Sequence, residues 1–224
     1  MPPDLSPIPN GYVTTRAGLH ALAEHVLSPL RHRAEGRIGL QAIDGGFGPP
    51  LPDGRRVVVV GDRLHDGDRT NRITTLGDAA RFLGVPVGAP TEVYQPVTDP
   101  DPDRPLAVEP AAAEVVCGWF TFGAGVLAGS SSDAAPDDDP SEAQLWPEHF
   151  DLALSIGPDG ARANVGASPG DSDHDAPYLY VGPWEPRPGG LWNEPWGASL
   201  GYQALRQGGD PLAFVQEALR ALES

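Results

Sequence analysis

The residue types that can carry chemistry are concentrated in the C-terminal third of the chain, residues 145–202. His149 and Asp151 lie two residues apart where a segment of alternating apolar and polar residues begins. Since alternate residues of a strand point to the same side, we expect both side chains on the polar face of a strand. A histidine beside a carboxylate can act as an oriented general base, which makes this pair the candidate catalytic site. The alternative is the ordinary solvated face of an antiparallel sheet.

Three further polar residues, Asp171, Asp173 and His174, lie close together in the segment SPGDSDHD (168–175). Carboxylate oxygens suit Ca²⁺ or Mg²⁺, and an imidazole suits Zn²⁺, so these residues are the candidate metal ligands. No second group of ligands follows at a convincing spacing. A hydrated acidic turn is therefore the favoured interpretation, and we expect no cofactor.

Aromatic residues are dense in the segment that follows, where prolines and paired glycines separate them. Rigid loops that present tryptophan and tyrosine make good stacking walls for a sugar, an aromatic metabolite or a partner peptide. The alternative is that the rings only cover the core of the sheet. The candidate binding residues are Tyr178, Tyr180, Trp184, Trp192 and Trp196.

Apolar spacing and capping residues predict four helices. A helix from Thr15 to Gly36 contains Pro29, which should kink or end it. The other three are expected at 75–83, 110–127 and 210–222. Strands are expected at 38–42, 57–60, 150–156, 161–165 and 178–181, whereas 45–54 and 66–71 are expected to be a loop and a polar turn.

Helices and strands interleave early in the chain, while strands cluster late. This order predicts an α/β (α+β) fold with a single mixed sheet, antiparallel in its C-terminal part, and about four helices packed on it. A four-residue turn at Gly157–Gly160 would place Ser155 opposite Arg162. We expect one domain over 1–224, with an acidic flexible loop at 130–142.

The composition restricts the classes of partner. The net charge is −16, and all 15 basic residues are arginine, so phosphate backbones and anionic membrane surfaces should be repelled. Without lysine, Schiff-base chemistry is excluded. The single Cys117 cannot form an internal disulfide, the N-terminus lacks the features of a signal peptide, and the apolar run 115–127 suits a buried helix. These features together predict a cytoplasmic protein.

Several segments of the chain resemble those of a group of uncharacterised actinobacterial proteins of unknown function. The most distinctive are LWPEHFDLA (145–153), SPGD (168–171) and PYLYVGPW (177–184). The resemblance implies a cytosolic actinobacterial protein. It assigns no catalytic or binding residue.

Two functions follow from these residues. The favoured one is a binding or accessory protein that uses the Trp/Tyr surface for a small molecule or a protein partner, because no complete catalytic constellation is present. The alternative is a hydrolase or isomerase with a His/Asp site, with or without a metal. A structural or oligomerisation role is a third possibility.

Overall fold

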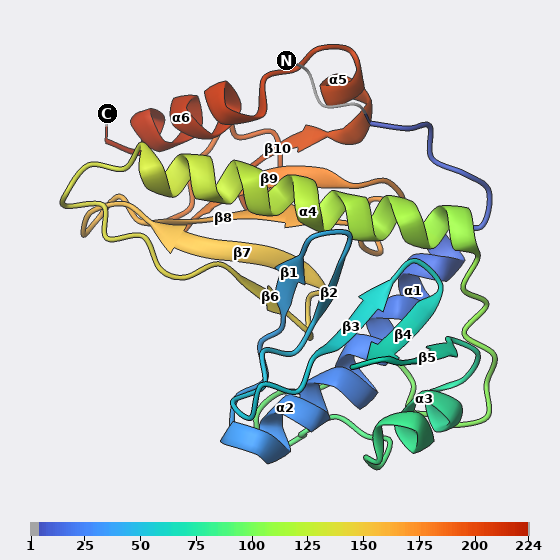
Figure 1. Ribbon diagram of the computed structural model, residues 1–224. Helices are drawn as coiled ribbons and strands as arrows, with labels where there is room; N and C mark the ends of the chain where they lie inside the picture. The colour runs from blue at the N-terminus through green and yellow to red at the C-terminus, as the bar shows by residue number, and fades with distance from the viewer. Residues whose placement is uncertain (1–4, 224) are drawn as a thin grey trace. The chain divides into compact units, whose positions relative to one another are not determined.

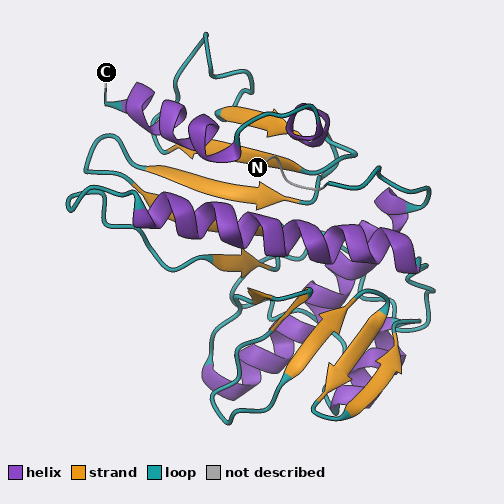
Figure 2. Cartoon of the chain, turned by 45° about the horizontal axis from the view of Figure 1, so that its top comes forward, coloured by secondary structure: helices purple, strands orange, loops and turns teal. Residues whose placement is uncertain are grey.

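The structure is a computed structural model that describes residues 5–223, and it contains helices and two separate sheets (Figures 1 and 2). The α+β class is confirmed. The expected single mixed sheet is wrong, because the strands form two five-stranded sheets whose pairings are antiparallel. Strand signals in a sequence show where strands lie, but a strand's partner is decided by contacts between distant segments.

The chain divides into two compact units. The N-terminal unit consists of Pro7–Thr121 and Leu145–Phe150, and the C-terminal unit consists of Phe122–Gln144, the described residues from Asp151 onward and those before Pro7. One helix, α4 (Pro110–Ser132), contributes to both units. The expectation of a single domain over 1–224 stays a prediction.

The N-terminal unit begins with a long helix made of α1 (Tyr12–Leu22), the π-helical segment η1 (Ala23–Leu27) and α2 (Ser28–Glu35). The helix does not end at Pro29, as it could have done. Proline has no N–H to offer the carbonyl of His25, and that carbonyl instead accepts the N–H of Gly88 at 3.0 Å. The local irregularity is the wider π turn before the proline. Gly36, with φ 72°, ends the helix as expected.

The first sheet is a meander in the order β1-β2-β3-β4-β5. Three of its strands were not expected: β2 because Gly46 and Gly48 look like a loop, and β4 and β5 because their residues are mostly polar. Both glycines are required in β2, since an added Cβ would collide with backbone carbonyls of β3. The strands are β1 (Gln41–Ile43), β2 (Gly46–Gly48), β3 (Val57–Val60), β4 (Arg63–Asp66) and β5 (Arg69–Arg72).

The two predicted central helices are present. Helix α3 (Leu76–Leu83) is capped by Thr75, whose hydroxyl accepts the N–H of Asp78 at 3.1 Å. Helix α4 continues to Ser132, beyond its expected end. By length and composition alone α4 could cross a membrane, with a mean hydropathy of 1.5, but half of that apolar stretch is buried inside the protein.

The second sheet has the order β10-β9-β8-β7-β6. Its strands β7 to β10 lie in the C-terminal unit with two helices at the end of the chain, whereas most of β6 belongs to the segment Leu145–Phe150 of the N-terminal unit. The predicted hairpin and the predicted last helix are confirmed, and the short helix α5 was not expected. The elements are β6 (Gln144–Trp146), β7 (Asp151–Ile156), β8 (Ala163–Ser168), β9 (Tyr178–Pro183), β10 (Ala198–Gly201), α5 (Tyr202–Arg206) and α6 (Pro211–Leu222).

The register of the β7–β8 hairpin differs from the expected one. Ser155 pairs with Asn164 and not with Arg162, because the turn is two residues longer than a four-residue turn. A shift by two residues keeps every side chain on its expected side of the sheet. Asp151, Ser155 and Asn164 therefore share one face of the sheet.

The two faces of the second sheet are different. Leu154, Val165 and Val181 are buried on one face, where α6 packs on β9 and β10 (Figure 1). The part of α4 that belongs to this unit lies on the same face, with Gly123 directly against Ala167. The polar residues of β7, β8 and β9 point to the opposite face.

The acidic loop predicted at 130–142 starts later than expected, because α4 continues to Ser132 and residues 130–132 are therefore helical. The rest of the loop is hydrogen-bonded to the β7–β8 hairpin. The N–H of Ser141 donates to the carbonyl of Ser155, and the N–H of Gly157 donates to the carbonyl of Asp138. Its predicted flexibility stays a prediction.

Candidate functional site

The polar face of the second sheet holds a tyrosine that reaches across a neighbouring strand. Tyr180 in β9 is paired with Gly166 in β8, and Gly166 is paired with Ala153 in β7. Atoms of the Tyr180 ring lie only 2.5 Å from where a Cβ of residue 166 would stand, so the ring lies directly over the glycine. The missing side chain lets the Tyr180 hydroxyl donate a short hydrogen bond to Oδ2 of Asp151, which is 7% exposed.

A second tyrosine–carboxylate pair lies beside the first. Tyr178 is two residues before Tyr180 on the same face of β9, and its hydroxyl donates to Oδ2 of Asp171 at 2.5 Å. The other oxygen of Asp171 accepts the backbone N–H groups of Asp173 and His174, both at 2.8 Å. Residues 171–174 therefore form a turn that holds the Asp171 carboxylate against β9.

His174 connects two loops of the unit. Its Nδ1 lies 3.3 Å from Oδ1 of Asp171, and its Nε2 lies 3.1 Å from Oε1 of Glu194. Glu194 also accepts the hydroxyl of Ser199 at 2.8 Å. The imidazole can donate from both nitrogens only when it is protonated.

The surroundings change the pKa values of these groups. Burial lowers the pKa of His174, but the hydrogen bonds to Glu194 and Asp171 outweigh it, and the pKa is raised above its ordinary value of 6.5. Burial also works against ionisation of Asp171, yet the bonds from Tyr178 and from the backbone lower its pKa below 3.8. Burial, followed by the nearby carboxylates, raises the pKa of Tyr178 and Tyr180, so both phenols stay neutral donors.

Three aromatic rings pack together on this face, and we call Tyr178, Tyr180 and Trp196 the ring cluster. The ring centroids of Trp196 lie 5.9 Å from Tyr178 and 5.8 Å from Tyr180, and the two tyrosines are 6.2 Å apart. His174 adds a fourth ring, 4.6 Å from Tyr178. The outermost ring is Trp196, which is 41% exposed, so the cluster offers a stacking surface.

The structure thus brings together six of the residues singled out from the sequence: Asp151, Asp171, His174, Tyr178, Tyr180 and Trp196. Trp184 is not part of this group. It follows β9 and is 60% exposed. Its Nε1 donates to Oδ1 of Asn164 at 3.1 Å, and the guanidinium of Arg162 lies over its ring. Trp192 lies in the loop before β10, where its backbone N–H donates to Gly189. Asp173 is exposed and contributes its backbone to the turn.

The two residues of the candidate catalytic pair belong to different units. His149 is exposed and belongs to the N-terminal unit, whereas Asp151 begins β7 of the C-terminal unit. Phe150 between them adopts a φ of 53°, which is unusual for a residue other than glycine and breaks the alternation expected of a strand. The imidazole that does meet a carboxylate in this unit is His174.

Two important residues of the site were missed in the sequence, Glu194 and Gly166. Glu194 stands between Trp192 and Trp196, and its place among aromatic residues could have drawn attention to it. The importance of Gly166 depends on which strand lies beside it, so no local signal could have identified it.

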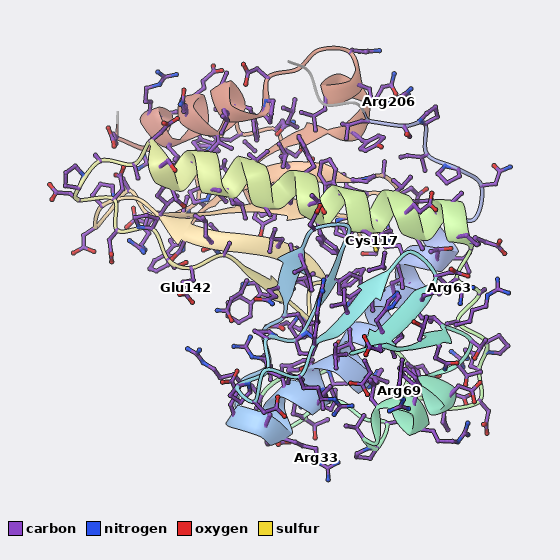
Figure 3. All side chains as sticks on the ribbon, in the orientation of Figure 1. Arg33, Arg63, Arg69, Cys117, Glu142 and Arg206 are labelled. Atoms are coloured by element: carbon purple, nitrogen blue, oxygen red, sulfur yellow. The ribbon has the colours of Figure 1, made fainter. Side chains whose placement is uncertain are left out.

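No group of three His, Cys, Asp or Glu side chains within residues 5–223 has an arrangement that could hold a metal ion. The candidate ligands Asp171 and His174 are instead bonded to each other, and the second nitrogen of the imidazole is directed at Glu194. A resident metal therefore has no support in this turn. The buried Cys117 of α4, labelled in Figure 3, is a core thiol whose pKa is raised by burial to about 11.

A second polar cluster, in the N-terminal unit, has a structural explanation. The fully buried Glu24 carboxylate accepts the backbone N–H groups of Val97 and Thr98 at 3.0 and 2.9 Å. Its neighbour His25 bonds the carbonyl of Thr98 and the N–H of Ala89. These contacts fasten the long loop after α3 to the π-helical segment, and they satisfy the buried polar groups.

Comparison of the chain with family models, with curated proteins and with solved structures found no match. The function of the site is therefore inferred from its own chemistry. That chemistry consists of the partly exposed ring cluster, bordered by a Tyr/Asp/His/Glu hydrogen-bond network.

Proposed function

We propose that the chain is a binding or accessory protein that holds a small polar molecule against the ring cluster. The observation that carries the proposal is the exposed ring of Trp196, packed against two tyrosines whose hydroxyls are held by carboxylates. Rings fixed in this way lose little conformational entropy when a ligand binds. His174 and Glu194 at the border of the cluster supply polar contacts that orient the ligand.

The proposal also includes the class of partner and the cellular compartment. The strong negative charge favours a small molecule or a protein as the partner over nucleic acid or a membrane surface. The resemblance to cytosolic actinobacterial proteins and the reducing environment suggested by the lone cysteine favour the cytoplasm.

A thermal-shift screen of small polar molecules, followed by calorimetric titration, tests the proposal. We expect at least one compound to raise the melting temperature of the wild-type protein, and Trp196→Ala to abolish this shift. Trp184→Ala is the matched control, because this exposed tryptophan lies outside the ring cluster. The proposal fails if the ligand-induced shift survives in a folded Trp196→Ala protein, or if no compound produces one.

A second candidate function is a hydrolase or isomerase, which is favoured by one observation. His174 is held between two carboxylates and can serve as a general acid on a ligand at the ring cluster. The test is turnover of any compound found in the screen. Loss of turnover in His174→Gln with binding retained would support catalysis, and binding without turnover would support the first proposal.

A further inference from the structure

We propose that the ligand of the ring cluster is an organic cation that carries an ammonium group. This inference rests on the binding function proposed above and adds the chemical class of the ligand. It is carried by two observations, which are the hydrogen-bonding groups that the cluster leaves for a ligand and the charge around it.

The hydroxyl donors at the ring cluster are already engaged by carboxylates. Tyr178 donates to Asp171, Tyr180 donates to Asp151, and Ser199 donates to Glu194. A sugar needs donors as well as acceptors from its site, because each hydroxyl group both donates and accepts. Apart from the indole N–H of Trp196, what the cluster offers is carboxylate oxygens and ring faces. Both of these groups attract positive charge, so the combination matches a cationic ligand.

The two loops that border the cluster are strongly acidic. Segments 169–177 and 184–197 contain five carboxylate side chains, Asp171, Asp173, Asp175, Glu185 and Glu194, against one arginine, Arg187, and one histidine, His174. The guanidinium of Arg187 donates to the carbonyl of Leu222 at 3.1 Å, so it is directed to the C-terminal end of α6. The local field therefore attracts cations to the rings.

One tight turn carries both side chains of the proposed site, the indole of Trp196 and the carboxylate of Glu194. Glu194 and Gly197 exchange backbone hydrogen bonds of 2.9 and 3.2 Å, and Trp196 lies within this turn. The amide of Asn193 fastens the turn to β10, since its Oδ1 accepts the N–H of Ser199 at 2.8 Å. An exposed indole and a carboxylate two residues apart are thus held in place before any ligand arrives, which is the arrangement that cation–π recognition uses.

The test uses a pair of probes of nearly the same shape, choline and its neutral isostere 3,3-dimethyl-1-butanol, titrated calorimetrically into the full chain. We expect choline to bind about tenfold more tightly than the neutral probe, and to bind more weakly as NaCl is added. Trp196→Ala and Glu194→Gln should each weaken choline binding about tenfold. Trp184→Ala should not change it. Trp196→Phe, which keeps a ring, replaces the alanine variant if the latter does not fold.

Each of the other outcomes has a definite meaning. Equal affinity for the two probes, or a Trp196-dependent neutral ligand from the screen without choline binding, overturns the cation inference and leaves the proposed binding function standing. Choline binding that is the same in the Trp196 and Glu194 variants overturns it too, because it reflects only the overall charge of −16. If no compound of any charge gives a Trp196-dependent signal, the proposed function itself fails.

Discussion

Individual side chains on the polar face of the second sheet act in donor–acceptor pairs, and the pairs differ in burial. The Asp151 carboxylate is almost completely covered, while the Asp171 side chain is 38% exposed. A hydrogen bond to a buried charged group contributes more to stability than one whose acceptor water can reach. The two tyrosines should therefore respond differently to loss of their hydroxyls.

Tyr180→Phe removes the donor to buried Asp151 and should lower the free energy of unfolding by about 1–3 kcal/mol. Tyr178→Phe is the control, since water can replace its hydroxyl at Asp171, and it should have the smaller effect. Urea denaturation of the two variants measures the difference. Equal losses would show that the burial of Asp151 does not matter to the strength of this bond.

The stability of the protein should depend on pH through His174. Its pKa in the folded protein is raised above 6.5, so the folded state binds its proton more tightly than the unfolded state. The stabilisation is therefore fully present below pH 6.5, and it is lost as the pH rises through the folded pKa. For Asp171 the pKa is lowered, so its contribution is present above 3.8 and is lost as the pH falls through the folded pKa.

The measurement is the difference in unfolding free energy between the wild-type protein and His174→Gln as a function of pH. This difference should be largest on the acid side of 6.5, before Asp171 titrates, and should shrink toward alkaline pH. His149→Gln controls for the loss of one imidazole at an exposed position. A difference that grows with rising pH would contradict the assigned bonds of His174.

At the scale of elements, a glycine in β8 allows side chains of the two neighbouring strands, β7 and β9, to contact each other. Gly166 contributes no side chain, and this allows a tyrosine of β9 to reach an aspartate of β7 across it. Strands that are not adjacent are thereby linked by side chains on one face. The geometry of the ring cluster depends on this close approach.

Gly166→Ala should displace the Tyr180 ring, because the new Cβ would stand 2.5 Å from ring atoms. We expect a loss of about 1–3 kcal/mol in the free energy of unfolding, together with weaker ligand binding at the ring cluster. Gly182→Ala in β9 is the matched control, since its added Cβ would meet nothing closer than 3.8 Å. Chemical denaturation of both variants tests the prediction, which fails if the two alanines are equally tolerated.

At the scale of the whole molecule, the charge of −16 makes the folded chain repel itself. Salt should therefore stabilise it. Between about 0.01 M and about 0.15 M NaCl the screening length falls from about 30 Å to about 8 Å. A gain of about 1 kcal/mol would raise the melting temperature by about 2–4 °C in a chain of this size.

Differential scanning calorimetry over this range of salt measures the effect, and a lower pH provides an independent check. Partial protonation of carboxylates also reduces the repulsion, so the salt dependence should be weaker at pH values near the isoelectric point of about 4.5. A melting temperature that falls with added salt would show that attractive ion pairs, such as Arg55–Asp66, outweigh the repulsion.

The sequence by itself determined the elements whose signals are local. The Thr75 cap, the Gly36 stop, the alternation in β7 and the apolar pattern of α4 each depend on residues within a few positions of one another, and each was predicted. Part of the candidate site was accessible for the same reason, since Asp171, His174 and Tyr178 lie within one turn and the strand that follows it.

Only the tertiary structure decided which strands pair and which distant residues meet. Two sheets form where one was expected, Gly46–Gly48 is a strand because β3 lies against it, and Glu194 joins His174 only because β10 pairs with β9. Strand pairing connects residues far apart in the chain, so no local preference encodes it. Within the region 145–202, the structure joins Asp151 to the ring cluster and His174, whereas His149 belongs to the other unit.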